Sequence, residues 1–351
     1  MRELFQATIE RLLADRSDSA AVLASEGGGW SQELWDAIEE SGFTLAAVPE
    51  ALGGAEACWA DLYVIARAAG RFAVPVPLPE ALLANWLLGQ VGIEPQTGSL
   101  SFAADADLIF VNGVVSGAIR DVPWGRHVDA VVAISNVDSA DPQVLLLSRS
   151  SAQRILPSLN IAGEPRDALF FANAEVLHSA ALPEGLSRDV LRLGGVLLRA
   201  GQIAGALGSL LDMTSDYASQ RNQFGKPIGS FQAIQQQLAV FAEQAAAANI
   251  AAEAAFVESA PSLAWMPIAV AKIISADAAT QCANIAHAVH GAIGFTEEFS
   301  LHLFTRRLWA WRSEFGSATS WSQQIGQQVC SAGGNGFWPL LTQHANAGVR
   351  P

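Results

Sequence analysis

The chain has 351 residues, of which 51% are hydrophobic and only 15% are charged, and its formal net charge is −14. This length suffices for two or three domains with large cores, and the low charge indicates that much of the surface is buried between subunits. The acidic balance argues against a nucleic-acid partner, whose backbone requires cationic groups. It does not exclude an anionic small ligand, because local fields outweigh the net charge.

Cysteine usage and the N-terminal residues favour a reducing cytoplasm as the location of the protein. The three cysteines are few and far apart in the sequence, at Cys58, Cys282 and Cys330. This spacing fits neither a zinc site nor a disulfide framework. The N-terminal residues carry charges and have no signal-peptide core. The most apolar helical stretch, residues 191–211, contains Arg192, Arg199 and Gln202, which disfavours a membrane span.

Residues 1–98 are predicted to form an N-terminal helical domain. Ser31 is placed to cap a helix that carries Leu34, Trp35 and Ile38 on one face and ends at residues 41–42. A further helix over residues 59–70 has its apolar residues at helical spacing.

Residues 99–184 change character and predict a small antiparallel β-barrel or sandwich. Short apolar runs read as strands at residues 101–104, 108–111, 130–134, 144–147 and 168–171. Between the second and third of these regions, Asn112-Gly113 is a strong signal for a tight hairpin.

Residues 185–351 return to helical periodicity and predict a four-helix bundle. The expected helices cover residues 191–211, 231–258, 267–289 and 299–311, with more helix after Ser317. No internal repeat or low-complexity tract interrupts this pattern.

The turn between the first two of these helices, residues 221–232, concentrates residues suited to ligand binding; we call it the elbow. Gly225 and Gly229 permit backbone conformations that other residues avoid, and Ser230 is placed as the N-cap of the next helix. The elbow presents a cation, an aromatic ring and an amide, at Arg221, Phe224 and Gln232. Such a turn is able to bind a phosphate and stack a ring, although an ordinary helical hairpin is an equally simple interpretation.

A second glycine-containing loop follows the third helix, at residues 290–296. Gly291 and Gly294 permit one helix to end and the next to begin close by. Alternatively, their bare backbone N–H groups are positioned to approach an anion.

The elbow resembles the Arg-x-x-Phe-Gly-x-x-Ile-x-x-x-Gln signature of acyl-CoA dehydrogenases, and the later loop resembles their His-Gly-Gly-x-Gly-Phe-Thr loop. The Val48-Pro49-Glu50 run followed by Gly53-Gly54 is also similar to that family. The resemblance implies an N-terminal helical domain, a β-domain and a C-terminal bundle, with FAD as the cofactor. It further implies that the elbow reaches the FAD of a neighbouring subunit, with contacts from Arg221, Phe224, Gln232, Gly291 and Ala292.

The catalytic base that the resemblance implies is missing from its usual positions. The family commonly uses the Glu of a Glu-Gly-Thr segment, which falls here on Phe315-Gly316-Ser317. Some members place the base on the earlier long helix, at a position that is Gly195 here. Glu314 is the candidate that remains, although one residue along a helix turns a side chain by about 100°. The flavin-facing Trp and Thr of the β-domain are also absent near Asp121, and Trp124 is expected to be a core or interface aromatic.

Two functions from different classes follow from the resemblance. The first is FAD-dependent α,β-dehydrogenation of an acyl-CoA thioester, with Glu314 or a residue not identified from the sequence as the base, and an electron-transfer flavoprotein type of acceptor. The second is a non-catalytic partner subunit that completes the FAD site of a heteromeric acyl-CoA dehydrogenase. Either function implies a homo- or hetero-tetramer and no metal. A helical scaffold without flavin is a third, less favoured alternative.

Overall fold

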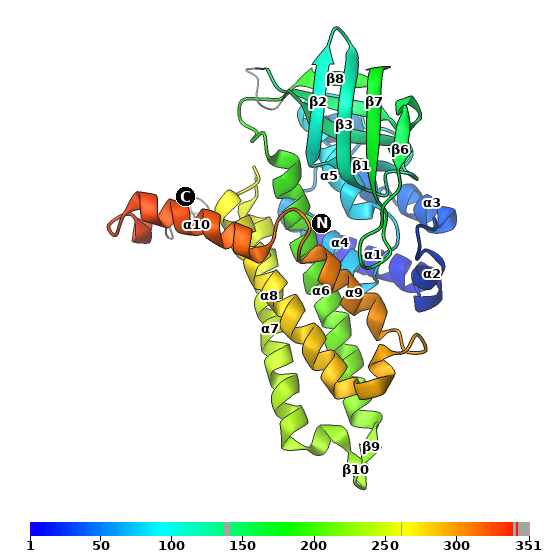
Figure 1. Cartoon of the computed structure of the whole chain (residues 1–351), viewed down its shortest axis with the longest axis vertical. Coiled ribbons are helices and arrows are strands. Elements are labelled where there is room, and N and C mark those ends of the chain that lie inside the picture. Colours follow the sequence, from blue (N-terminus) through cyan, green and yellow to red (C-terminus); the bar gives the residue numbers. More distant parts are fainter. Residues whose placement is uncertain (137–140, 261, 340–341, 343–351) are drawn as a thin grey trace.

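The computed structural model describes residues 1–136, 141–260, 262–339 and 342. It is mainly helical, with a β-region between two groups of helices, which confirms the predicted fold class (Figure 1). The first group comprises α1 (Arg2–Arg16), α2 (Ser19–Ala24), α3 (Gln32–Glu40), α4 (Trp59–Arg71) and α5 (Leu78–Gln90), with short 3-10 turns at Phe43–Leu45 and Glu50–Leu52. Strands occupy the region between Leu100 and Ala181, and the boundaries at residues 98/99 and 184/185 remain predictions.

The β-region consists of two four-stranded sheets packed against each other. The first has the order β1-β4-β5-β8, and the second has the order β2-β3-β7-β6. The strands are β1 (Leu100–Ala103), β2 (Asp105–Val111), β3 (Val114–Pro123), β4 (Ala130–Ser135), β5 (Gln143–Ser148), β6 (Arg154–Leu156), β7 (Arg166–Glu175) and β8 (His178–Ala181). The predicted hairpin joins β2 to β3, where Asn112 and Gly113 both have positive φ, at 51° and 83°. These are the dihedrals that a two-residue hairpin requires.

One pairing departs from the antiparallel expectation: β1 and β4 are parallel. The chain leaves the first sheet after β1, forms β2 and β3 in the other sheet, and returns in the original direction. Strand β4 is buried on both faces, because Val131 and Ala133 pack between the sheets while Val132 and Ile134 pack against the helices. This burial explains why its sequence is apolar throughout instead of alternating.

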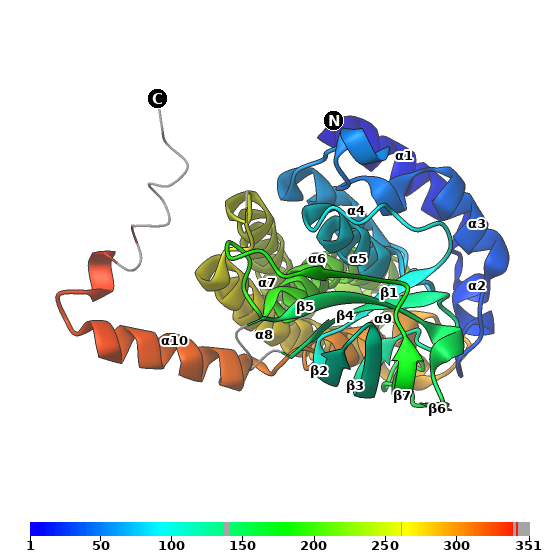
Figure 2. The same ribbon diagram turned by 90° about the horizontal axis from the view of Figure 1, so that it is seen from above.

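The C-terminal helices are α6 (Val190–Gln220), α7 (Gln232–Glu258), α8 (Trp265–His290) and the shorter α9 (Leu301–Trp311). Helix α10 (Ala318–Ala332) extends away from the body of the molecule (Figures 1 and 2). Helix α6 is long and apolar enough to cross a membrane, but 94% of its most apolar window is buried inside the protein. It is therefore the central core helix, packed against α4, α7, α8 and α9.

Two serines that were predicted to cap helices make no capping hydrogen bond through their side chains. Ser31 stands at the N-cap of α3, but its hydroxyl makes no capping hydrogen bond. Its ψ of 93° is far from the 173° and 160° of Asp18 and Ser317, whose side chains do cap α2 and α10. Ser230 ends a 3-10 turn, and its hydroxyl donates to the carbonyl oxygen of Pro227, so α7 begins two residues later at Gln232.

The N-terminal helices contact the central helix through glycines at the α4–α6 crossing. A Cβ atom on Gly70 would lie 1.9 Å from the carbonyl oxygen of Gln202, and one on Gly205 would lie 1.9 Å from that of Arg67. Both obstacles are backbone atoms inside helices. The two backbones therefore approach each other at a distance that only glycine allows.

We expect Gly205→Ala to lower the free energy of unfolding by about 1–3 kcal/mol or more, because helix backbones must move apart to admit the methyl group. Gly208→Ala is the matched control on the same helix. The nearest atom to its Cβ position is Nη1 of Arg71, at 3.7 Å. Since alanine favours helix by about 0.5–1 kcal/mol, this control is expected to be neutral or stabilising. Urea denaturation of both variants measures the difference, and equal effects would contradict the close-approach explanation.

Candidate functional site

A pocket of about 490 Å³ lies where the β-region meets the C-terminal helices. Its wall combines the β1–β2 corner, the end of β3, the β6–β7 loop, the start of α6 and the segment between α9 and α10. The lining residues include Asp121, Asn160, Arg166, Arg192, Glu314 and Phe315. At Asp121 the β3–β7 register shifts and φ is 51°, so a bulge turns this residue out of the regular ladder. The pocket thus lies at the junction where the resemblance implies a flavin wall.

Glu314, the candidate base, is held by three donors. Its Oε1 accepts from Nε of Arg166 at 2.8 Å and from Nδ2 of Asn160 at 3.0 Å, and its Oε2 accepts from Nε of Arg199 at 2.6 Å. Burial raises the pKa of this carboxyl, but Arg166 and Arg199 outweigh burial and hold its pKa at about 2. A general base works best with a pKa near the working pH and with a free lone pair facing the substrate. Glu314 is therefore an anchored carboxylate with low basicity.

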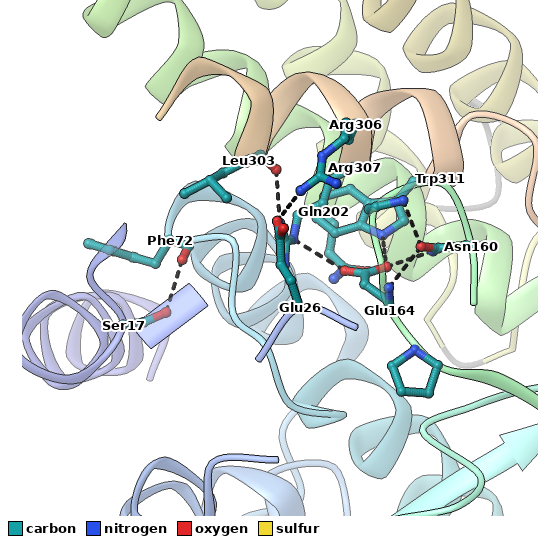
Figure 3. Close-up of polar contacts among 12 residues, drawn as sticks. Ser17, Glu26, Phe72, Asn160, Glu164, Gln202, Leu303, Arg306, Arg307 and Trp311 are labelled. Atoms are coloured by element: carbon teal, nitrogen blue, oxygen red, sulfur yellow. Dashed lines mark hydrogen bonds and ion pairs between the residues drawn. The ribbon is translucent and has the colours of Figure 1, made fainter. Parts of the chain in front are cut away.

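The donors of Glu314 belong to a larger buried ion cluster. Arg199 also donates to Oε1 of Glu80 at 2.7 Å, and Arg166 donates to Oε2 of Glu164 at 2.9 Å. Arg307 pairs with Oε1 of Glu164 at 3.3 Å. Figure 3 shows Asn160, Trp311 and Arg307 converging on Glu164 from the β6–β7 loop and α9. Three carboxylates thus alternate with three guanidinium groups, so the cluster balances its own charge.

These partners come from every part of the fold: α5, the β6–β7 loop and β7, α6, and α9 with its following loop. Sequence reasoning missed them as a set, because they are spread over residues 80–314. One signal was present. Arg199 and Gln202 interrupt the most apolar helix, and both side chains are almost fully buried. Charged residues inside an apolar helix require partners, and this requirement predicts a buried ion pair.

Lys272 on α8 is a further buried basic residue, in addition to the three arginines of the balanced cluster. It is fully buried, and its Nζ donates to the carbonyl oxygens of Trp311 at 3.0 Å and Glu314 at 2.8 Å. Burial lowers the pKa of Lys272 to about 7, partly offset by the charge of Glu314. The lysine fixes the backbone of the segment that presents Glu314 and Phe315 to the pocket.

The two other positions at which the resemblance implies a base, Phe315 and Gly195, lie against each other. Phe315 follows Glu314 with a φ of 59°, a conformation that is uncommon for a bulky residue. Its ring stacks on Phe102 of β1, with centroids 5.6 Å apart and an interplanar angle of 25°. A Cβ atom on Gly195 of α6 would lie only 2.8 Å from this ring. One position therefore holds an aromatic ring, and the other holds no side chain.

The elbow lies at the far end of the bundle. Strands β9 (Asn222–Gln223) and β10 (Lys226–Pro227) form a minimal hairpin there, with positive φ at Phe224 and Gly225 (Figure 1). The Phe224 side chain is 91% exposed. Arg221 and Gln232 are also exposed, and among the described residues no carboxylate lies within ion-pair distance of Arg221. A cation and a ring on an exposed hairpin suit a dinucleotide such as FAD.

The Gly291 loop lies at the same end of the molecule. Tyr217, one helical turn before Arg221, stacks on His290 with centroids 4.4 Å apart, and its hydroxyl donates to the carbonyl oxygen of His290. Gly291 follows directly, with φ 63° and ψ −140°, a conformation open essentially to glycine alone. Gly291 and Ala292 are exposed in a 3-10 turn. The structure thus brings four predicted cofactor residues, and Gln232 beside them, to one end of the bundle.

Glu314 is not at that end. It pairs with Arg199, which lies 22 positions before Arg221 in sequence, and at a rise of about 1.5 Å per residue the two ends of this helix segment are roughly 33 Å apart. One FAD molecule contacting both the elbow and the pocket would therefore have to lie between two subunits. Trp124 is buried against Trp30 and His127, so it is the core aromatic that was expected.

We expect the free energy of unfolding to rise between pH 7 and 9, by up to about 1.4 kcal/mol per pH unit. In this window an unfolded Lys272 still binds a proton that the folded state has released, so stability increases with pH. Lys272→Met should remove this slope in urea titrations. Lys226→Met, at the only other lysine in the chain, should keep it. An unchanged slope in Lys272→Met would show that Lys272 stays charged in the folded protein. Above pH 9 the buried Cys282, whose pKa burial raises to about 12, opposes the trend.

Comparison with known proteins identifies the family. The acyl-CoA dehydrogenase N-terminal domain profile matches residues 1–97, and the C-terminal domain profile matches residues 195–329. Acyl-CoA dehydrogenase IpdE2 of Mycobacterium tuberculosis is 29% identical over 315 residues, covering 87% of this chain and 90% of that protein.

Solved structures share the fold. The ChsE4–ChsE5 complex from Mycobacterium tuberculosis has a TM-score of 0.83 at 21% identity, covering 94% of this chain and 97% of that one. An FAD complex of PigA has a TM-score of 0.80 at 16% identity, covering 93% and 97%. The two family profiles together cover more than half of the sequence, and they match in the order of the helical domains described above. The chain therefore belongs to the acyl-CoA dehydrogenase family.

Proposed function

We propose that this chain is a subunit of a heteromeric FAD-dependent acyl-CoA dehydrogenase and supplies no catalytic base of its own. Membership of the family supports FAD-linked oxidation of an acyl-CoA thioester as the reaction of the assembled enzyme. The observation that carries the subunit role is the pairing of Phe315 with Gly195. These two positions lie against each other where the pocket-lining Phe315 ring contacts α6, and neither holds a carboxylate.

FAD supplies the acceptor for the β-hydride when it is bound, and the protein must supply a base for the α-proton. In this chain the exposed Arg221 guanidinium would pair with the pyrophosphate, and the Phe224 ring would pack beside it. Gln232 would donate or accept through its amide, and the backbone N–H groups at Gly291 and Ala292 would approach the cofactor closely. All five residues lie at the end of the bundle remote from Glu314, so their FAD would extend toward the pocket of another subunit.

The likeness to a complex of two different chains supports the heteromeric form, since the ChsE4–ChsE5 structure covers 94% of this chain. A fatty, branched or sterol-like acyl chain would each suit a largely apolar protein. The visible spectrum tests the assembly. The chain expressed alone should be colourless, and co-expression with a second acyl-CoA dehydrogenase chain from the same genome should give flavin bands that bleach with acyl-CoA. A yellow protein that bleaches without a partner would contradict the proposal.

A second candidate function is a homomeric enzyme in which Glu314 is the base. One observation favours it: the side chain of Glu314 lines the pocket and is 15% exposed. The low pKa and the three donors make it the weaker candidate.

Arg221→Ala should weaken FAD retention by the assembled enzyme about 10- to 100-fold, because a hydrogen-bonded charge is lost from the cofactor. Lys226→Ala is the matched control: it removes one positive charge from the same elbow, where the ammonium lies 4.4 Å from the Phe231 ring centroid. Its expected effect is less than threefold. Equilibrium dialysis against FAD measures both, and equal losses in the two variants would show a general charge effect instead of a specific contact.

Glu314→Gln in the assembled enzyme should leave kcat within tenfold of wild type, while the melting temperature falls because a partner of two buried arginines is lost. If Glu314 were the base, kcat would fall by about 10²–10⁴-fold. Glu33→Gln, at an exposed residue of α3, controls for the loss of one carboxylate. Stopped-flow reduction of the flavin by acyl-CoA separates the two outcomes.

A further inference from the structure

We propose that Phe315 is a plug: its ring closes the inner end of the pocket and prevents an acyl chain from reaching Gly195 on helix α6. This inference rests on the proposed function and names the residue that excludes the acyl group from this subunit's own pocket. The plug consists of one ring and the three groups that hold it, at Phe102, Gly195 and Arg199.

The ring is fixed from several sides. Phe102 on β1 is fully buried and stacks on one face, and the Arg199 guanidinium carbon lies 5.7 Å from the ring centroid. Phe315 itself is partly buried against the large helical core, yet it also lines the pocket. The ring therefore forms the boundary between the pocket and the core.

Helix α6 is shaped to accept this ring. Gly195 lies in the interior of a 31-residue helix, where glycine costs about 0.5–1 kcal/mol relative to alanine. The neighbouring Gly194 gives the same close approach to Leu83, whose side chain would lie 2.5 Å from a Cβ atom there. The absence of side chains at both positions thus has a packing reason. At Gly195 the neighbour that occupies the space is a pocket-lining ring.

The backbone at the plug is constrained as well. Phe315 and Gly316 have successive positive φ values of 59° and 107°. Lys272 holds this segment through the carbonyl oxygens of Trp311 and Glu314, and Trp321 donates to the carbonyl oxygen of Phe315 at 3.2 Å. Strained conformations persist only where the surroundings enforce them. The segment is therefore built to present the ring in one orientation.

Binding of unreactive CoA compounds to the full chain tests the plug. The probes are CoA and a saturated S-octyl-CoA thioether, which cannot be dehydrogenated. The measured quantity is the dissociation constant of CoA divided by that of the thioether. Wild type should give a ratio within threefold of one, because the Phe315 ring keeps the alkyl chain out of the apolar space beside Gly195. Phe315→Ala should raise the ratio to tenfold or more in favour of the thioether, since each buried CH₂ strengthens binding several-fold.

Three results would overturn the plug. They are a wild-type ratio already above tenfold, a ratio unchanged by Phe315→Ala, or no binding of either probe by the folded variant. Phe315→Leu should give an intermediate ratio. This variant provides the test if the alanine variant does not fold. Failure of the proposed function would show separately, as FAD retention that does not depend on Arg221.

A second measurement tests the contact itself. Gly195→Ala should lower the melting temperature in wild type, because the methyl group displaces the ring. In the Phe315→Ala background the same change should leave or raise the melting temperature, since alanine favours helix. If Gly195→Ala lowered the melting temperature in both backgrounds, the proposed contact between Gly195 and the plug would be contradicted.

Discussion

The structure depends on one buried interaction, the alternating cluster of three glutamates and three arginines around Arg199. Burying these charges is costly, and removing one member typically costs 3–5 kcal/mol because its partner stays behind uncompensated. Such a cluster is weak evidence for added stability, but it is strong evidence for a fixed arrangement. Its members come from the N-terminal helices, the β-region and both long and short C-terminal helices. The cluster therefore fixes how these parts meet, and the pocket is formed where they meet.

The same cluster explains why Glu314 is close to the pocket and yet chemically occupied. A carboxylate that compensates Arg166 and Arg199 cannot accept a proton without leaving two buried guanidinium groups short of charge. Structural anchoring and proton abstraction thus compete for one side chain. With the pKa at about 2, anchoring dominates. The adjacent position, where the resemblance implies the family's base, holds the Phe315 ring.

Much of the fold was predictable because its signals are local. Helical periodicity, the Asn112-Gly113 hairpin and the unbroken apolar run of β4 each report on a few neighbouring residues. The position of the elbow, as a turn between two helices, was also predictable from a short motif, and its contact with a cofactor stays a prediction. The parallel pairing of β1 with β4 was not, because a crossover through another sheet leaves no local trace. The ion cluster was not predictable either, because its members are up to 234 residues apart in the sequence. The charge of Arg199 within an apolar helix indicated only that a buried partner exists.

The exposed elbow and the occupied base positions of the pocket have one common explanation under the proposed function. On a monomer surface, the 91% exposed Phe224 and Arg221, which has no ion-pair partner among the described residues, contribute nothing to the core. In the pocket, the two positions at which the resemblance implies a base hold Phe315 and Gly195, and neither is a carboxylate. The proposed division of labour would account for both features: the elbow would serve a cofactor at a neighbouring pocket, and this chain's own pocket would need no carboxylate. Helix α6 separates the two regions, so the two proposed roles would fall on different residues.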